Sequence, residues 1–202
     1  MLDYLSVSDI KNLIIFGVII IGILLIWATL SSFVTVVDGP TIYEDKKNYN
    51  KLMQSYKEKF KEVFENENYT EVKRSYLLNQ LETEIIKVNQ KIAKKYVGAV
   101  VKDKAKVHNI ETFPAEIPNN VFLKILTGKE DSFIWCVFSD SKGRYVNFDK
   151  GEEVEIDGTI DHINLVPSKL PSHLDENVDK LFKADFAIHL QDNANIKKIK
   201  GN

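Results

Sequence analysis

The pattern of apolar and polar residues changes character twice along the chain. An uncharged apolar segment near the N-terminus is followed, up to about residue 96, by apolar residues spaced three and four apart. Beyond Gly98 apolar and polar residues alternate. Periods near 3.6 and 2 are typical of amphipathic helices and half-exposed strands. The pattern predicts an α+β protein with an N-terminal transmembrane helix, an antiparallel helical hairpin and a small five-stranded β-barrel.

The first segment, residues 12–37, contains no charged residue. Its central part, Leu13–Leu30, consists mainly of Ile, Leu, Val and Phe and would form a helix of roughly 27 Å, close to the hydrocarbon thickness of a bilayer. We therefore expect a transmembrane helix at 12–37 after a short tail at 1–11, in a single-pass protein of the cell membrane. A cleaved signal peptide is the alternative, although residues 1–10 lack the Lys or Arg that usually opens one.

The side of the membrane that carries the remaining residues depends on the lysines near the span. Only Lys11 precedes the span closely, whereas Lys46, Lys47, Lys51 and Lys57 follow it. Because positively charged flanks stay in the cytoplasm, this count favours a cytoplasmic position for the rest of the chain. Many proteins with a single N-terminal anchor export the following domain, so the opposite orientation remains open.

The region 41–97 is predicted to form two helices. The first is expected from about Ile42 to Glu65, with one apolar face, and the second from Thr70, a potential N-cap, to about Tyr96. A short connection between helices favours an antiparallel hairpin. A coiled coil between chains is the alternative, but aromatic residues on the first helix suit a broader packing surface than a coiled-coil seam offers.

The region 98–202 is predicted to be a barrel of five strands, because runs with period two are separated by Gly and Pro. The expected strands are Val101–His108, Val121–Leu126, Phe133–Phe138, Val154–Ile160 and Phe186–Leu190. Between the last two strands, Ser172 is a potential cap for a short helix with a buried face formed by Leu174, Val178, Leu181 and Phe182.

The segment Ile134–Phe138, followed by Gly151, Val154, Ile156, Gly158 and Ile160, resembles an OB-fold family of bacterial domains described as like the anticodon-binding domain of transfer-RNA synthetases. The resemblance covers roughly the last hundred residues and implies an OB-like barrel that acts as a binding module. This chain differs from the family in that its short helix follows the fourth strand, and Ala105 stands where the family often has glycine.

The charge of the chain bears on whether this barrel could bind nucleic acid. The chain has 27 basic and 29 acidic residues, for a net charge of -2, and residues 99–202 are also slightly acidic. We therefore expect nucleic acid to be an unlikely partner. If a nucleic-acid or ligand face exists, its candidate residues are the lysines that alternate along the first strand and two aromatic residues: Lys102, Lys104, Lys106, Trp135 and Tyr145.

The sequence carries none of the common catalytic, metal-binding or cofactor motifs. The four histidines have no metal-ligand spacing, and no nucleophile motif or phosphate-binding glycine loop occurs. Cys136 is the single cysteine, which excludes an intramolecular disulfide. We expect a non-enzymatic protein without a metal or cofactor. A haem carrier is a remote alternative, because His173 is followed by acidic residues, but Asp175, Glu176 and Asn177 fit a helix start equally well.

The functional hypothesis from the sequence is a membrane-tethered adaptor whose helical hairpin and OB-like domain bind a partner protein. The alternative is an OB domain that binds single-stranded nucleic acid at the membrane. Neither the partner nor the oligomeric state follows from the sequence.

Overall fold

The structure is a computed structural model that describes residues 15–21, 35–114, 116–128, 132–167, 169–171, 178–183 and 186–199. The chain divides into two compact units, Met1–Thr35 and Val36–Asn202. In the first unit the described residues 15–21 are helical. The second unit contains the paired helices and the sheet.

The predicted membrane span at 12–37 is contradicted. Among the described residues, no helix has both the length and the apolar character that crossing a membrane requires. The helical residues 15–21 cover only about 10 Å of the roughly 30 Å of hydrocarbon, while residues 12–14 and 22–34 lie outside the described part. The two long helices carry many charged residues. The assignments to a single-pass membrane protein and to the cell membrane are therefore corrected.

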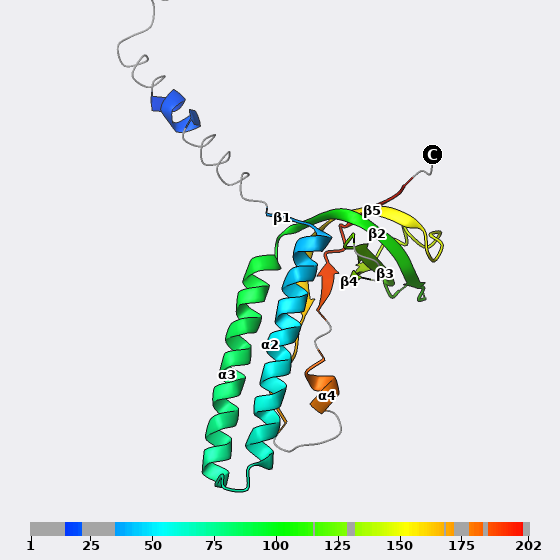
Figure 1. Cartoon of the computed structure of the whole chain (residues 1–202). Helices are drawn as coiled ribbons and strands as arrows, with labels where there is room; N and C mark the ends of the chain where they lie inside the picture. The colour runs from blue at the N-terminus through cyan, green and yellow to red at the C-terminus, as the bar shows by residue number, and fades with distance from the viewer. Residues whose placement is uncertain are drawn as a thin grey trace, which may run out of the picture. The chain divides into compact units, whose positions relative to one another are not determined.

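Both predicted helices are present (Figure 1). Helix α2 spans Gly39–Glu65 and helix α3 spans Glu71–Tyr96. The side chain of Asp38 accepts a hydrogen bond from the backbone N–H of Thr41, and that of Thr70 accepts one from Lys73, so each helix has a capped start. The short connection makes the helices antiparallel neighbours within one chain.

The helix pair buries the apolar face that the sequence predicts. Met53, Phe60 and Ile85 are fully buried between the helices and the elements beside them. Polar contacts at the edges of the pair add to this packing: the Tyr49 hydroxyl donates to Asn89 at 2.9 Å, and Lys95 and Tyr96 both bind the carboxylate of Asp45. The buried face of α2 consists of Gly39, Ile42, Tyr49, Met53, Tyr56, Phe60 and Val63.

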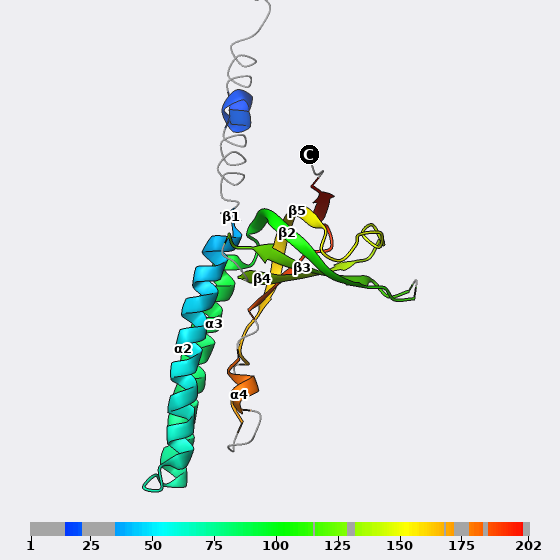
Figure 2. The same ribbon diagram turned by 45° about the vertical axis from the view of Figure 1, so that its right-hand side comes forward.

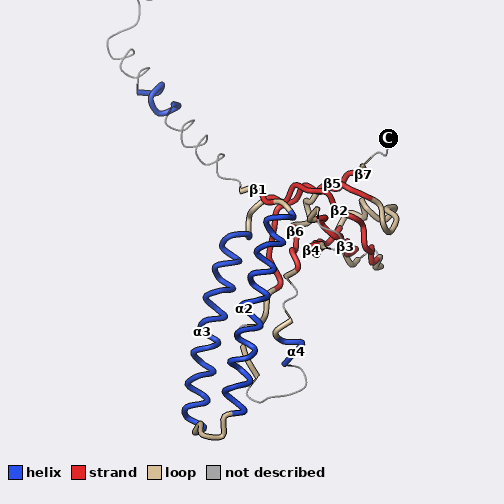
Figure 3. The backbone as a smooth tube through the Cα atoms, viewed as in Figure 1, coloured by secondary structure: helices blue, strands red, loops and turns tan. Residues whose placement is uncertain are grey.

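Five strands close into a barrel (Figure 3). They pair in the order β2, β3, β4, β6, β5, and β5 pairs back onto β2. The contact between β4 and β6 is parallel and the others are antiparallel. This closed barrel is consistent with an OB-like fold. Its strands are β2 (Val100–Glu111), β3 (Asn119–Leu126), β4 (Phe133–Asp140), β5 (Glu153–Asn164) and β6 (Ala187–Leu190).

The barrel interior is filled by alternate residues of each strand, as the period of two requires. Strand β3 shows this clearly, since Val121, Leu123 and Ile125 are buried while Phe122 and Lys124 lie on the outer side. Cys136 lies in the interior and is fully buried, and burial raises the pKa of its thiol. The thiol therefore packs as a small apolar group.

The connection from β5 to β6 runs along the helix pair before returning to the barrel (Figure 2). The backbone N–H of Leu170 donates to Glu82 at 2.8 Å, and Lys57 forms an ion pair with Asp179 at 2.8 Å. Helix α4, Val178–Leu181, lies in this connection, and the ring of Phe182 packs against Phe60 at 5.7 Å. Residues 172–177, including the expected cap Ser172 and Leu174, lie outside the described part.

Two short strands extend the sheet beyond the predicted five. Strand β1 (Val36–Val37) pairs in parallel with the start of β2, and strand β7 (Asn195–Lys198) pairs with β5. Because β7 lies beside β5 on the side away from β2, the outer surface here has three neighbouring strands: β2, β5 and β7.

Candidate binding groove

The three candidate lysines lie on the outer side of β2, where each faces a carboxylate of β5. The antiparallel register places Lys102 opposite Asp157, Lys104 opposite Glu155 and Lys106 opposite Glu153. Lys102 and Lys106 form ion pairs with these partners, at 3.1 and 3.5 Å.

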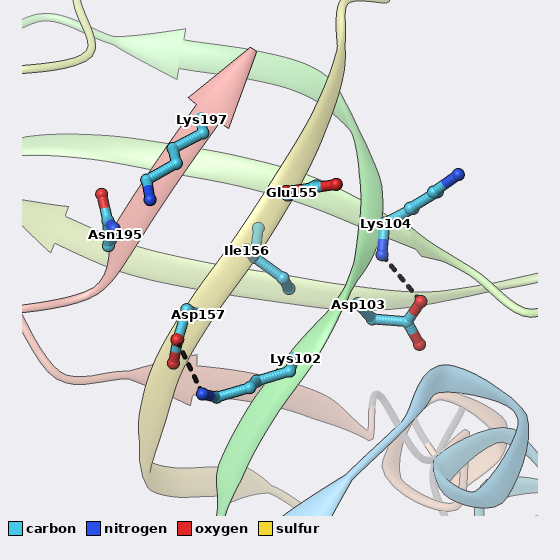
Figure 4. Close-up of a pocket in the computed structure, with 8 residues that line it drawn as sticks. All are labelled: Lys102, Asp103, Lys104, Glu155, Ile156, Asp157, Asn195 and Lys197. Carbon is cyan, nitrogen blue, oxygen red and sulfur yellow. Dashed lines mark hydrogen bonds and ion pairs between the residues drawn. The ribbon is translucent and has the colours of Figure 1, made fainter. Parts of the chain in front are cut away.

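We call these three facing pairs the ladder. A shallow hollow of about 340 Å³ lies over two of them, Lys102 with Asp157 and Lys104 with Glu155 (Figure 4). Lys197 of β7 and Asp103 of β2 also line the hollow, together with Ile156 and Asn195, so its lining has three lysines and three carboxylates. The side chains of Lys102 and Asp157 are both about half exposed, so their ion pair adds little stability. The main effect of the facing carboxylates is to neutralise the charge of the three lysines. A nucleic-acid strand would therefore meet no net positive charge here.

Tyr145 lies in the turn between β4 and β5 and is buried. Its hydroxyl donates to the carbonyl oxygen of Ala194 at 3.0 Å and accepts from the N–H of Ile196 at 3.1 Å. Tyr145 therefore fixes the start of β7 against the barrel, and the structure does not bring it together with the lysines or with Trp135 on one exposed face.

Trp135 lies half-buried on the outer side of β4, within a cluster of aromatic side chains. The imidazole of His108 packs edge to face on the indole with ring centroids 4.8 Å apart, and the ring of Phe133 does the same with centroids 5.1 Å apart. The ammonium group of Lys124 lies over the rings of Phe133 and Trp135, 4.5 Å from the centre of Phe133 and 5.3 Å from that of Trp135. This arrangement fixes the indole while leaving part of it accessible.

A groove begins at this cluster and crosses the outer face of the barrel. Register places Phe122 of β3 beside Val137 of β4, Val137 beside His189 of β6, and His189 beside His162 of β5. These residues form the floor of two adjoining hollows of about 380 and 570 Å³, which share Phe122, Val137 and His189 in their linings. We call this continuous surface the outer groove.

The walls of the outer groove carry carboxylates and amides. Glu111 lies at the end near Trp135, and Asp161 and Asp192 lie at the end near His162. Among the described residues that line the groove there is no Lys or Arg. The lining therefore has a negative formal charge, in contrast to the balanced charge of the ladder.

Two histidines stack at the acidic end of the groove. The rings of His162 and His189 lie 4.2 Å apart and nearly parallel, at 11°. His162 Nδ1 is 2.9 Å from the carboxylate of Asp161, and His189 Nε2 is 2.9 Å from the side-chain nitrogen of Asn164. These contacts hold the two stacked rings in place at this end of the groove, where both line it.

Two titratable groups at opposite ends of the groove have shifted pKa values. Burial, together with nearby Lys124 and Lys150, lowers the pKa of His108, so its ring is neutral at pH 7. Hydrogen bonds from the side chain and backbone of Ser141 lower the pKa of Asp192, which keeps this carboxylate ionised. The groove thus has an aromatic end, where Glu111 is offset by nearby Lys124, and an anionic end at Asp161 and Asp192.

Sequence reasoning singled out Trp135 but not its partners. Phe122 lies in an expected strand but was not a candidate residue, and the histidines of the groove were considered only for metal-ligand spacing. Among the described residues, no group of three or more His, Cys, Asp or Glu could hold a metal ion. The residues behind the haem alternative, His173 to Asn177, lie outside the described part.

Comparisons with protein-family models, with curated proteins and with solved structures found no match for this chain. Of the resemblance to the anticodon-binding OB family, the structure supports the fold alone: a closed five-stranded barrel, consistent with an OB-like fold.

Proposed function

We propose that this protein is a non-catalytic adaptor whose OB-like barrel binds an extended segment of a partner protein in the outer groove. The observation that carries the proposal is the lining of that groove. Half-buried Phe122, Val137 and Trp135 provide an apolar floor, while Glu111, Asp161 and Asp192 provide acceptors at its edges. An apolar floor with a few placed polar groups is typical of peptide-binding surfaces.

Electrostatics favours a protein segment over nucleic acid. Nucleic-acid affinity comes mainly from Lys and Arg that neutralise phosphates. The described lining of the groove has neither residue type, and the lysines of β2 face carboxylates of β5. A phosphate backbone laid along the groove would be repelled by Asp161 and Asp192.

The helix pair supports this role by holding the strands that build the groove. Phe186, just before β6, packs its ring against Tyr49 at 5.8 Å and against Tyr96 at 6.3 Å. Val166, just after β5, is bonded to both Tyr49 and Asn89. Strands β5 and β6, which carry His162 and His189, are therefore anchored to both helices.

A second candidate function is binding of single-stranded nucleic acid, the alternative that the sequence left open. One observation favours it: Trp135 and Phe133 lie beside Lys124, and an exposed aromatic ring next to a lysine can stack a base and contact its phosphate. The cluster could hold one base, but the acidic end of the groove would oppose a longer strand.

The two candidates can be separated by parallel selections on the full-length chain. A random dodecapeptide phage library and a random single-stranded oligonucleotide library are each selected on the wild type and on the double variant Phe122→Ser/Trp135→Ala. The matched control, Lys102→Ala/Lys104→Ala, alters the ladder instead. We expect enrichment of peptides that is lost in the groove variant and kept in the control. Enrichment of oligonucleotides alone would replace the adaptor by the second candidate.

A further inference from the structure

We propose that the segment bound in the outer groove carries an apolar side chain and, four residues away, an arginine that binds Asp161 against the stacked histidines. This inference rests on the proposed function and names the chemistry of the partner. It follows from the length of the groove, from the uneven distribution of charge along it and from the geometry at the end formed by β5 and β6.

The length of the groove sets the spacing of the two side chains. Phe122, Val137, His189 and His162 lie on four adjacent strands, and neighbouring strands are about 4.8 Å apart. The row therefore spans roughly 14 Å. An extended chain rises about 3.4 Å per residue, so residues i and i+4 are about 14 Å apart and point to the same side. One residue rests on Phe122 while the other reaches His162.

The charges give the segment a direction. At the aromatic end the carboxylate of Glu111 is offset by Lys124 and Lys150, which lie near His108, so this end does not favour a cation. At the other end Asp161 lines the groove with its side chain 59% exposed, so it can accept a hydrogen bond from a ligand. Asp192 lies close by and is held ionised by Ser141, with Arg144 and Lys142 also near it. Asp161 is therefore the more available carboxylate, and a cationic side chain belongs at this end.

The histidine stack favours arginine over lysine. The rings of His162 and His189 are stacked face to face, and the side chain of His162 is 55% exposed, so the face of the His162 ring turned away from His189 is a flat surface. A guanidinium group is planar, can stack on such a surface and can bind a carboxylate with two parallel hydrogen bonds. An ammonium group offers neither feature. The same surface next to Asp161 thus provides both contacts that arginine makes best.

The inference is tested by titrating the ¹⁵N-labelled full-length chain with defined peptides and following the backbone amide signals. The probes are Gly-Ser-Phe-Ser-Gly-Ser-Arg-Gly-Ser and versions with Lys or Glu in place of Arg. A further version has Phe and Arg adjacent. We expect the Arg peptide to shift the amides of Phe122, Val137 and His162 and to bind more tightly than the Lys, Glu and adjacent versions.

Asp161→Asn is the decisive variant, and Asp157→Asn is its matched control, because both residues lie on β5, are half exposed and lose one charge. Asp161→Asn should weaken the Arg peptide about three- to fivefold, the upper part of the range for an exposed ion pair, while Asp157→Asn should leave its affinity within twofold. The amide spectrum of each free variant reports that the fold is intact.

Two outcomes would overturn the inference, and they differ in what they leave standing. If the Arg and Glu peptides shift the groove amides equally, or if Asp161→Asn has no effect, the arginine site is refuted while peptide binding in the groove stands. If neither these probes nor the selected peptides shift any groove amide, the proposed function fails as well.

Discussion

The hydroxyl of Tyr49 accepts a hydrogen bond from the backbone N–H of Val166, 117 residues further along the chain, at a distance of 3.1 Å. The same hydroxyl donates to Asn89, whose side-chain nitrogen in turn donates to the carbonyl of Val166 at 2.8 Å. Three segments, α2, α3 and the connection after β5, are thus joined by a closed set of hydrogen bonds. This set fixes the direction in which the chain leaves the barrel.

Replacing Tyr49 by Phe removes this junction without changing the packing of the ring. The N–H of Val166 would lose its acceptor in a buried position, so the free energy of unfolding should fall by about 1–3 kcal/mol. Urea unfolding followed by circular dichroism measures the change. Tyr76→Phe is the control, because that side chain is exposed, and it should change stability by less than about 0.5 kcal/mol. Equal effects of the two variants would contradict the role of the junction.

Tyr49 also predicts how stability depends on pH in the alkaline range. Burial raises the pKa of Tyr49 to about 12, from about 10 in the unfolded chain. The unfolded state therefore loses its proton first as pH rises, so the stability contributed by the protonated phenol is fully present below pH 10 and is lost between pH 10 and 12. Burial and the hydrogen bond to Asp45 raise the pKa of Tyr96 in the same direction.

Unfolding free energies measured from pH 9 to pH 12 test this linkage. The wild type should lose stability steadily above pH 10, and Tyr49→Phe should lose it less steeply, with Tyr96 accounting for part of the remaining slope. Parallel curves for the two proteins would show that Tyr49 is not protected from ionisation by the fold.

The packing of the helix pair is tested at Leu81, which is 5% exposed on the inner side of α3. Leu81→Asp places a carboxylate in an apolar seam and should lower stability by several kcal/mol. Ser75→Asp, on the exposed side of the same helix, should change it by less than about 0.5 kcal/mol. An unchanged melting temperature for Leu81→Asp would place this residue at the surface and refute the pairing.

The neutralised ladder predicts weak binding of single strands. Fluorescence anisotropy with a labelled oligothymidylate of twelve nucleotides should show that the full-length chain binds it no more than weakly at physiological salt. The triple variant Lys102→Ala/Lys104→Ala/Lys106→Ala should bind equally weakly. Three phosphate contacts would give a slope of log affinity against log salt of only about −2. Submicromolar affinity that falls steeply with salt, and is lost in the triple variant, would contradict the adaptor proposal.

The periodicity of the sequence was enough to predict α2, α3 and the five barrel strands, because each has a face that must be buried. It could not predict β1, which has only two residues, or β7, whose sequence Asn195–Lys198 has one apolar residue and therefore shows no alternation. The N-terminal apolar segment was assigned from hydropathy alone, and this assignment is contradicted. The described helices long enough to cross a bilayer are charged on one face.

The candidate site was harder to predict than the fold because it depends on which strands are neighbours. Trp135 was identified from its residue type, but the link from Phe122 through His189 to His162 requires the register of four strands. The lysines of β2 looked like a basic stripe because the sequence alone does not show which residues of the neighbouring strand lie opposite them. Their neutralisation becomes visible only when Asp157 and Glu153 are placed opposite them. Tyr145 was chosen as an exposed aromatic, whereas its hydroxyl is used inside the fold.

The most direct test of the outer groove uses Trp135 as its own reporter. The chain has two tryptophans, so Trp27→Phe leaves Trp135 as the single tryptophan in the full-length protein, and its emission is excited selectively at wavelengths that tyrosine does not absorb. This variant is titrated with a peptide selected from the dodecapeptide library, and binding is measured in parallel by calorimetry. We predict that the emission of Trp135 changes and saturates with the same Kd as the heat of binding. Saturable heat with unchanged Trp135 emission would place the partner elsewhere and contradict the proposed site.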